Sequence, residues 1–318
     1  MTKDQLETRQ TPLYFATVLA AIAFGVLAEA GAPVLEALIT PAIAGLMYAM
    51  FLQIPLLHGR ASLANRRFMA ALLLANFVLV PVLAWALTHR LTTHPALLIG
   101  ALLVLLAPCI DYVVVFTHMG KGDARLMLAA TPVLLLLQLV LLPLYLALML
   151  EDGHHINLKP GPFVQAFVLM IVVPLVLAVL TSAHVAKSER VSCWNDAWAW
   201  MPVPAMALVL FVVIASQIGS VLQALDQLLP VVPVYLGFAL LAPVIGWVTA
   251  RLMGLPVQQK RAVMFSASTR NSLVVLPLAL ALPEQMRTLA AAAVITQTLV
   301  ELICELVYVR AIPVVART

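Results

Sequence analysis

The residues best able to do chemistry lie inside long apolar segments of the sequence. Asp111 and Arg270 each interrupt such a segment, and Cys109 lies two residues before Asp111. A charged side chain at the centre of a bilayer costs at least about 2.5–3.5 kcal/mol on insertion scales. Asp111 and Arg270 therefore indicate either a substrate or ion site, or one structural ion pair. The Cys109 thiolate could bind a thiophilic solute, or the residue could be only a small buried side chain.

A second polar group lies towards the C-terminal end of the sequence. Glu301 and Glu305 are four residues apart, so they share one face of a helix. Glu301, together with Gln297, could line a cavity or carry a proton. Glu305 is expected to extend towards the membrane surface or to pair with Arg310. For the uncharged polar residues of the apolar segments we expect hydrogen bonds between helices: Asn76, Gln138 and Gln297.

The composition requires a membrane around these residues. Of 318 residues, 64% are apolar and 10% charged, and the mean hydropathy is +1.06. Soluble domains are about 45–50% apolar and about 25% charged. The sequence has no CxxC or HExxH spacing, no nucleophile–base set and no phosphate-binding loop, so we expect no enzyme, no metal and no cofactor. The predicted fold class is an all-α membrane protein.

Runs without charged residues predict where the chain crosses the membrane. Each is long enough to span about 30 Å of hydrocarbon. Eight runs are uninterrupted, and two more contain charges: 10–28, 37–59, 68–89, 91–110, 126–150, 160–186, 197–225 and 227–250, then 257–282 and 286–312. The sequence thus predicts ten transmembrane helices, of which the first is retained and not cleaved as a signal peptide.

The distribution of basic residues predicts the orientation. In the ten-helix arrangement, 14 Lys and Arg lie on one side, three on the other, and Arg270 lies within the membrane. The positive-inside rule then places both termini in the cytoplasm, in a multi-pass protein of the inner (cytoplasmic) membrane. This placement also explains the net charge of +4 and the pI near 9.1 without a nucleic-acid partner.

The two halves of the sequence resemble each other. Pro81–Trp85 and Pro243–Trp247 match at three of five positions, 162 residues apart, and five helices per half would invert one half relative to the other. The same offset aligns Pro108 with Arg270 and Cys109 with Asn271. These positions interrupt the fourth and ninth predicted helices, which are therefore expected to be broken and to form a transport site.

The predicted division of the chain follows from this repeat. It comprises a cytoplasmic leader, a first five-helix repeat, an extracytoplasmic connection, a second repeat and a cytoplasmic C-terminus: 1–12, 13–150, 151–161, 162–312 and 313–318.

The motifs around the two interruptions resemble those of the arsenite-efflux permeases (arsenical resistance type 3) of the bile acid/sodium symporter superfamily. The similar stretches are 107–110 followed by 120–123, and 265–268 leading into Asn271. The resemblance implies ten helices in two inverted repeats, with a panel domain from helices 1, 2, 6 and 7 and a core domain from the other six. It also implies that broken helices 4 and 9 cross at the midplane, and that Cys109 binds trivalent arsenic as a thiolate.

The chain departs from the permease pattern at the second interruption. Pro108 stands where the permeases usually have arginine, and Ser272 stands in the place of a glutamate implicated in proton coupling. The sodium-site pattern of the bile acid branch is also missing, which favours protons over sodium. The first candidate to replace the glutamate is Asp111, followed by Glu301. In the permeases an arginine of helix 4 lies near the site. Arg270, in helix 9 of this chain, could place its charge in the same space.

These observations predict a secondary transporter that exports arsenite or a related trivalent metalloid in exchange for protons. Its site would contain Cys109, Asp111, Arg270, Asn271 and Ser272, with Asp111 or Glu301 in coupling. The alternative is an organic-anion transporter of the same superfamily, in which Arg270 attracts the anion. A non-transporting membrane receptor is a third reading. The expected partners are the lipid bilayer and a small-molecule or metalloid substrate, and the oligomeric state stays open.

Overall fold

The computed structural model describes residues 10–28, 31–53, 65–110, 112–150, 165 and 168–317, and this part of the chain is helical apart from turns and one isolated bridge. By length and composition, six of the described helices could cross a membrane: Ala32–Leu52, Arg66–Leu91, Ala124–Leu150, Pro202–Gln223, Val232–Leu252 and Glu284–Val315. Further apolar helices are shorter, and they are Pro12–Leu27, Pro95–Leu105 and Val173–His184. The protein is therefore an all-α, multi-pass membrane protein. The predicted leader (1–12) and connection (151–161) lie largely outside the described residues.

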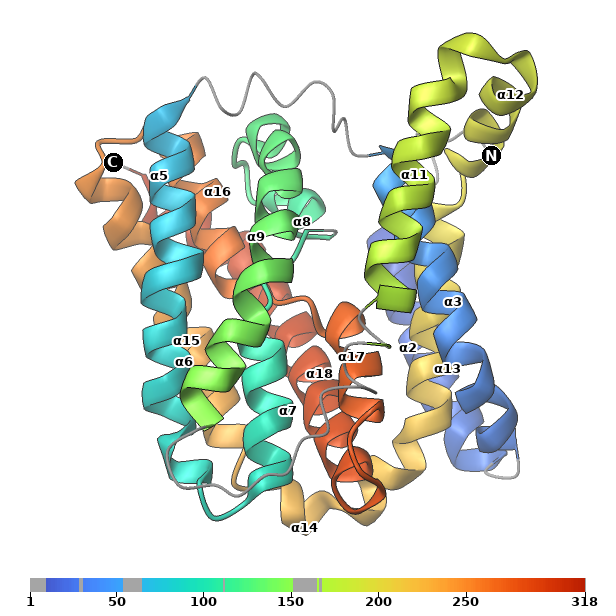
Figure 1. Cartoon of the computed structure of the whole chain (residues 1–318). Helices are drawn as coiled ribbons and strands as arrows, with labels where there is room; N and C mark the ends of the chain where they lie inside the picture. Colours follow the sequence, from blue (N-terminus) through green and yellow to red (C-terminus); the bar gives the residue numbers. More distant parts are fainter. Residues whose placement is uncertain are drawn as a thin grey trace. The chain divides into compact units, whose positions relative to one another are not determined.

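The chain forms two compact units, and each combines two stretches that are distant in sequence. The first unit comprises Met1–Ile54 and Lys159–Leu225, and the second comprises Pro55–Leu158 and Asp226–Thr318. The first thus takes the predicted helices 1, 2, 6 and 7, and the second takes the other six, which is the grouping implied by the resemblance. Figure 1 shows the helices of both units.

In the first unit, α13 packs against both α2 and α3, and α11 packs against α3. Its elements are α2 (Gln10–Leu27), α3 (Ala32–Gln53), η4 (Val168–Val172), α11 (Val173–His184), η5 (Val185–Lys187), α12 (Glu189–Trp198) and α13 (Pro202–Gln223). Two predicted span limits were wrong. Helix α3 begins before Glu36, because a charge near a helix end can lie outside the hydrocarbon. The run 197–225 is divided by a turn after Trp198, and α13 begins at Pro202, a residue that suits the first turn of a helix.

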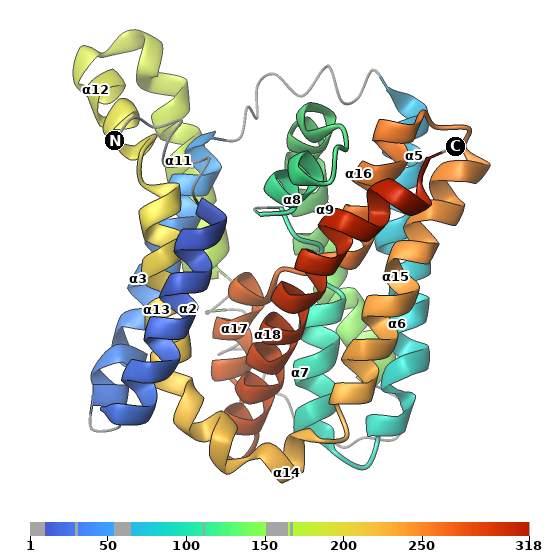
Figure 2. The same ribbon diagram turned by 180° about the vertical axis from the view of Figure 1, so that it is seen from behind.

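In the second unit, α18 packs along α7 and α17, and α15 packs along α16. Figure 2 shows α17 and α18 side by side from behind. The elements are α5 (Arg66–Leu74), η2 (Ala75–Leu79), α6 (Val80–Thr88), η3 (His89–Leu91), α7 (Pro95–Leu105), α8 (Val113–Met119), α9 (Ala124–Leu150), α15 (Val232–Leu252), α16 (Val257–Ser268), α17 (Ser272–Leu280) and α18 (Glu284–Val315). The short helix α14 (Leu225–Leu228) precedes α15 in sequence.

Two glycines allow helices of the second unit to approach closely. A Cβ atom at Gly100 of α7 would lie 2.6 Å from the carbonyl oxygen of Ala290 in α18. A Cβ atom at Gly246 of α15 would lie 2.7 Å from the Cα of Met264 in α16. Small residues are common where membrane helices pack backbone to backbone. These two contacts hold α18 and α16, which carry most of the polar residues described next, against their neighbours.

Candidate functional site

The two interrupted helices meet at their interruptions. Helix α7 ends at Leu105 and α8 begins at Val113, while α16 ends at Ser268 and α17 begins at Ser272. The two breaks pair as one isolated antiparallel bridge between Pro108 and Arg270. The Cys109 N–H donates to the Thr269 carbonyl at 3.1 Å, and the Asn271 N–H donates to the Ala107 carbonyl at 2.8 Å. The helix breaks expected from the sequence are present, and each satisfies the backbone of the other.

This pairing leaves the backbone of Arg270 to other partners, because Pro108 and Arg270 form the non-hydrogen-bonded pair of the bridge and its two hydrogen bonds are made by their neighbours. The Arg270 N–H donates to Oε2 of Glu301 at 2.9 Å, and its carbonyl accepts from the Tyr112 hydroxyl at 2.9 Å. Tyr112 is the last residue of the first break, directly before α8, and Glu301 lies in the middle of α18. The bridge is therefore held by side chains from two further positions.

The Arg270 side chain is fully buried and bonds to the ends of two half-helices. Its Nη2 donates to the carbonyls of Ser266 (2.5 Å) and Ala267 (2.9 Å), in the last turn of α16. The same nitrogen donates to Oδ1 of Asn76 at 2.8 Å, and Nη1 lies 3.4 Å from the carbonyl of Leu105, the last residue of α7. A helix C-terminus carries about half a negative elementary charge. The two helix ends together can thus balance the guanidinium charge.

The described partners of this guanidinium are uncharged oxygens, together with the ring of Phe238 at 5.5 Å from the guanidinium carbon. Nε of Arg270 is buried without a hydrogen-bond partner in the described part of the chain. Asp111, the predicted partner of Arg270, lies outside the described residues. Both roles that the sequence allows for that pair stay predictions.

Glu301 accepts hydrogen bonds on both carboxyl oxygens although it is 3% exposed. Besides the Arg270 N–H, Gln297 donates to Oε2 and the Tyr112 hydroxyl lies 2.7 Å from Oε1. Tyr112 has one hydroxyl hydrogen and two neighbouring acceptors, namely Glu301 and the Arg270 carbonyl. The proton on or off Glu301 therefore decides which acceptor the tyrosine can serve.

Glu305 does not reach the membrane surface, so that expectation was wrong. Its side chain is completely buried, and its Oε1 accepts from the Thr269 hydroxyl at 2.7 Å, while Oε2 has no partner among the described residues. Glu305 is buried because α18 approaches the second break. This approach brings the face of α18 that carries Glu301 and Glu305 against Thr269 and Arg270. One helix face thus supplies two carboxyl groups to the bridge.

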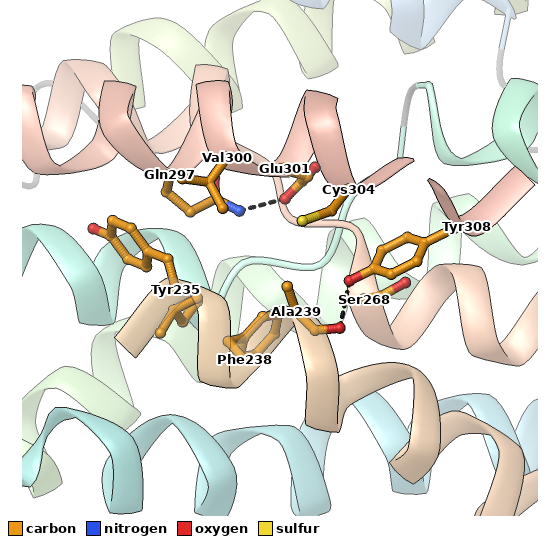
Figure 3. A pocket seen from close by; sticks show the side chains of 10 residues that line it. Tyr235, Phe238, Ala239, Ser268, Gln297, Val300, Glu301, Cys304 and Tyr308 are labelled. Carbon is orange, nitrogen blue, oxygen red and sulfur yellow. Dashed lines mark hydrogen bonds between the residues drawn. The ribbon is translucent and has the colours of Figure 1, made fainter. Parts of the chain in front are cut away.

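A small cavity of about 10 Å³ lies beside Glu301, which is room for about one water molecule. Figure 3 shows that Gln297, Glu301 and Cys304 of α18 face Phe238 and Ala239 of α15 across this cavity, with Ser268 beside them. Oε1 of Gln297 is buried without a partner in the described part of the chain. The cavity therefore presents polar groups next to the carboxyl group of Glu301.

The second break also contains buried donors without partners. Asn271 caps α17 by accepting from the Val274 N–H at 3.3 Å, but its Nδ2 has no partner in the described part of the chain. The hydroxyl of Ser272, the first residue of α17, is likewise without one. Both side chains are 1% exposed, and Cys109 is fully buried in the other break. Cys109, Arg270 and Asn271, predicted to share a site, are indeed brought together by the bridge.

Reasoning from the sequence missed three residues of this arrangement. Tyr112 had a usable signal, because it is a hydroxyl-bearing residue at the end of the first break. Thr269 and Cys304 had no such signal, because the hydrogen bond of Thr269 to Glu305 and the place of Cys304 in the cavity wall depend on where α18 packs. Asn76 bonds between helices as expected, because its Nδ2 donates to the Ser266 hydroxyl at 3.0 Å.

Comparison with known families identifies the family of this chain. The Sodium Bile acid symporter family matches residues 13–224, about two thirds of the chain. The chain belongs to this family. None of the curated proteins compared with the sequence matches it. Members of the family are transporters and not enzymes, so the chain is a membrane transporter whose partners are the bilayer and a small-molecule substrate.

Among the described residues, no three His, Cys, Asp or Glu residues are arranged to hold a metal ion.

Proposed function

We propose that this family member is a secondary active transporter in which solute and proton both act on the paired helix breaks. Ten helices would form two inverted repeats, 13–150 and 162–312, in the inner membrane with cytoplasmic termini. The 162-residue offset supports this: it carries α7, α8 and α9 onto α16, α17 and α18, and it equates Pro108 with Arg270, the two residues of the bridge. A two-fold axis between the repeats brings equivalent positions together, as Pro108 and Arg270 are in the bridge.

Glu301 is the best-supported carrier of the coupling proton. The observation that carries this proposal is its hydrogen bond to the Arg270 N–H inside the second break. When Glu301 is protonated, its hydrogen goes to the Tyr112 oxygen, and the Tyr112 hydrogen goes to the Arg270 carbonyl. When Glu301 is ionised, it competes for the Tyr112 hydrogen, and the Arg270 carbonyl loses its donor. Loss of the proton thus moves the Tyr112 hydrogen bond from the Arg270 carbonyl to Glu301 and strengthens the bond from the Arg270 N–H to Glu301, which links the proton to the geometry of the site.

Glu305 strengthens this coupling. It lies one helical turn from Glu301, and both carboxyl groups are buried on the same face of α18. Two buried negative charges so close together repel each other strongly, so the pair holds at least one proton while both carboxyl groups stay buried. Asp111 stays a second candidate for coupling.

Two substrate classes fit the breaks. An arsenite-like metalloid would bind to the sulfur of Cys109, which is buried in the first break. An organic anion would instead use the buried donors that have no partner among the described residues: Nε of Arg270, Nδ2 of Asn271 and the Ser272 hydroxyl. Asn271 and Ser272 lie at the N-terminus of α17, where the helix dipole favours negative charge.

Flux into everted membrane vesicles tests the proposal. Radiolabelled arsenite and a radiolabelled bile acid are offered separately, with a proton gradient, a sodium gradient or none. We expect proton-driven arsenite uptake that is lost in Cys109→Ser and retained in Cys193→Ser, a matched control whose cysteine is exposed. Bile acid uptake that is unaffected by Cys109→Ser would establish the anion alternative.

Glu301→Gln separates coupling from binding. The amide keeps the shape of the side chain but cannot release a proton, so driven uptake should be lost while substrate binding to the purified protein persists. Full proton-driven uptake in Glu301→Gln would refute the role of Glu301. Uptake driven only by sodium would refute proton coupling.

A further inference from the structure

A basic hollow of about 430 Å³ lies at the C-terminal end of α18. Its wall contains four cationic side chains, and of the described residues no acidic one lines it: Lys121, Arg261, Arg310 and Arg317. Figure 2 shows the end of α18 next to α16, the helix that carries Arg261. Lys121 comes from the turn between α8 and α9. Nothing in the transport mechanism uses these residues.

Arg261 builds the floor of the hollow. Its guanidinium donates to the carbonyls of Pro313 (3.2 Å) and Ala316 (3.1 Å) at the end of α18, and to the carbonyl of Lys121 at 3.2 Å. Arg261 therefore offsets the negative end of the α18 dipole. The charges of Lys121, Arg310 and Arg317, all three exposed, are left for a ligand.

The other part of the wall is apolar and continues along α18. Ile303, Val307, Arg310 and Val314 follow the i, i+4, i+7, i+11 spacing and so share one helix face. The three apolar residues are 64%, 59% and 53% exposed, respectively. A free inorganic anion gains nothing from such a stripe, whereas an acyl chain can lie along it.

The length of α18 puts the hollow at the depth of lipid headgroups. Its 32 residues extend over about 48 Å at about 1.5 Å per residue, and the hydrocarbon core is about 30 Å thick. Figure 2 shows α18 inclined to α15, so α18 spans less depth than its length. The 23 residue steps from Arg287 to Arg310 rise about 35 Å along the helix axis. These two charged residues therefore bracket the hydrocarbon, and the turn after Arg310 lies at headgroup depth.

We propose that this hollow binds the phosphate of an anionic phospholipid, with one acyl chain along the Ile303–Val314 face of α18. Lys121, Arg310 and Arg317 would contact the phosphate. Basic pockets beside membrane helices suit anionic headgroups, and each cation near the surface contributes about 1 kcal/mol, or about fivefold in affinity.

Native mass spectrometry of the purified full-length protein tests this site. The protein is equilibrated with equal amounts of phosphatidylglycerol and phosphatidylcholine with the same acyl chains. We expect phosphatidylglycerol to be retained preferentially, and the preference to fall about 25-fold in Arg310→Gln/Arg317→Gln. Lys121→Gln, an independent single variant, should lower it about fivefold. Arg66→Gln/Arg67→Gln is the matched control, because it removes two exposed charges outside the hollow.

Three results would overturn the proposal. Equal retention of the two lipids by the unmodified protein would show that the hollow does not select anionic headgroups. An equal loss in the Arg66→Gln/Arg67→Gln control would show a general effect of surface charge. Displacement of phosphatidylglycerol by millimolar inorganic phosphate would identify a site for free phosphate, in which the apolar face has no part.

Discussion

Replacing Arg270 by glutamine tests whether helix ends balance its charge. In the structure, Nη2 serves Asn76 and two carbonyls of α16, and Nη1 points at the last carbonyl of α7. Glutamine is shorter and uncharged, so it leaves these acceptors buried without a donor. The loss should therefore appear as lower stability even when no substrate is present.

The magnitude follows from the number of hydrogen bonds. Nη2 has two hydrogens for three acceptors, and Nη1 makes only a long contact, so about two full bonds are lost. Hydrogen bonds to charged groups contribute about 1.5–3 kcal/mol each, and release of the buried charge offsets part of the sum. We expect a net loss of about 3 kcal/mol. At about 2–4 °C per kcal/mol, this corresponds to a fall of about 6–12 °C in apparent Tm.

The assay is thermal unfolding of the purified protein in detergent at a fixed heating rate, because membrane proteins commonly unfold irreversibly. Arg270→Lys keeps the charge but has one nitrogen, so its apparent Tm should fall between those of the unmodified protein and Arg270→Gln. The decisive comparison is Asp111→Asn/Arg270→Gln. If this double variant regains the original Tm, an ion pair with Asp111 balances Arg270, and the reasoning from helix ends is refuted.

Two other substitutions test the packing and the hydrogen bonds of the site. Gly246→Ala puts a Cβ 2.7 Å from the Cα of Met264 and should destabilise the protein by about 1–3 kcal/mol in the same unfolding assay. The control is Gly45→Ala, whose Cβ meets nothing within 4 Å and which should be neutral or stabilising. Equal effects of the two substitutions would contradict the close approach of α15 and α16. Tyr112→Phe removes the hydroxyl shared by Glu301 and the bridge, and a bond to a charged group is worth about 1.5–3 kcal/mol. Proton-driven flux should therefore fall at least about tenfold, and unchanged flux in correctly folded vesicle protein would exclude the hydroxyl from coupling.

The sequence was sufficient to predict an all-α, multi-pass membrane protein, because membrane helices are specified locally. About 20 apolar residues without charge identify a span whatever surrounds them, and Pro108 and the polar run before Ser272 mark the two breaks within otherwise apolar helices. The meeting of the two breaks was implied by the family resemblance, in which helices 4 and 9 cross, and the 162-residue offset aligned the two interruptions. The number of helices and the inversion of the repeats stay predictions.

The chemistry of the site depended on tertiary packing. A charge inside an apolar segment announces that a partner exists, but not which one. Arg270 bonds to carbonyl groups that every sequence possesses, so no pattern of residue types could identify them. Glu305 looked like a residue of the membrane surface because Arg310 follows it, yet the angle at which α18 meets the second break buries it against Thr269. Local composition determined which segments form apolar helices and where two of them break, whereas hydrogen bonds between distant segments exist only once those helices are packed.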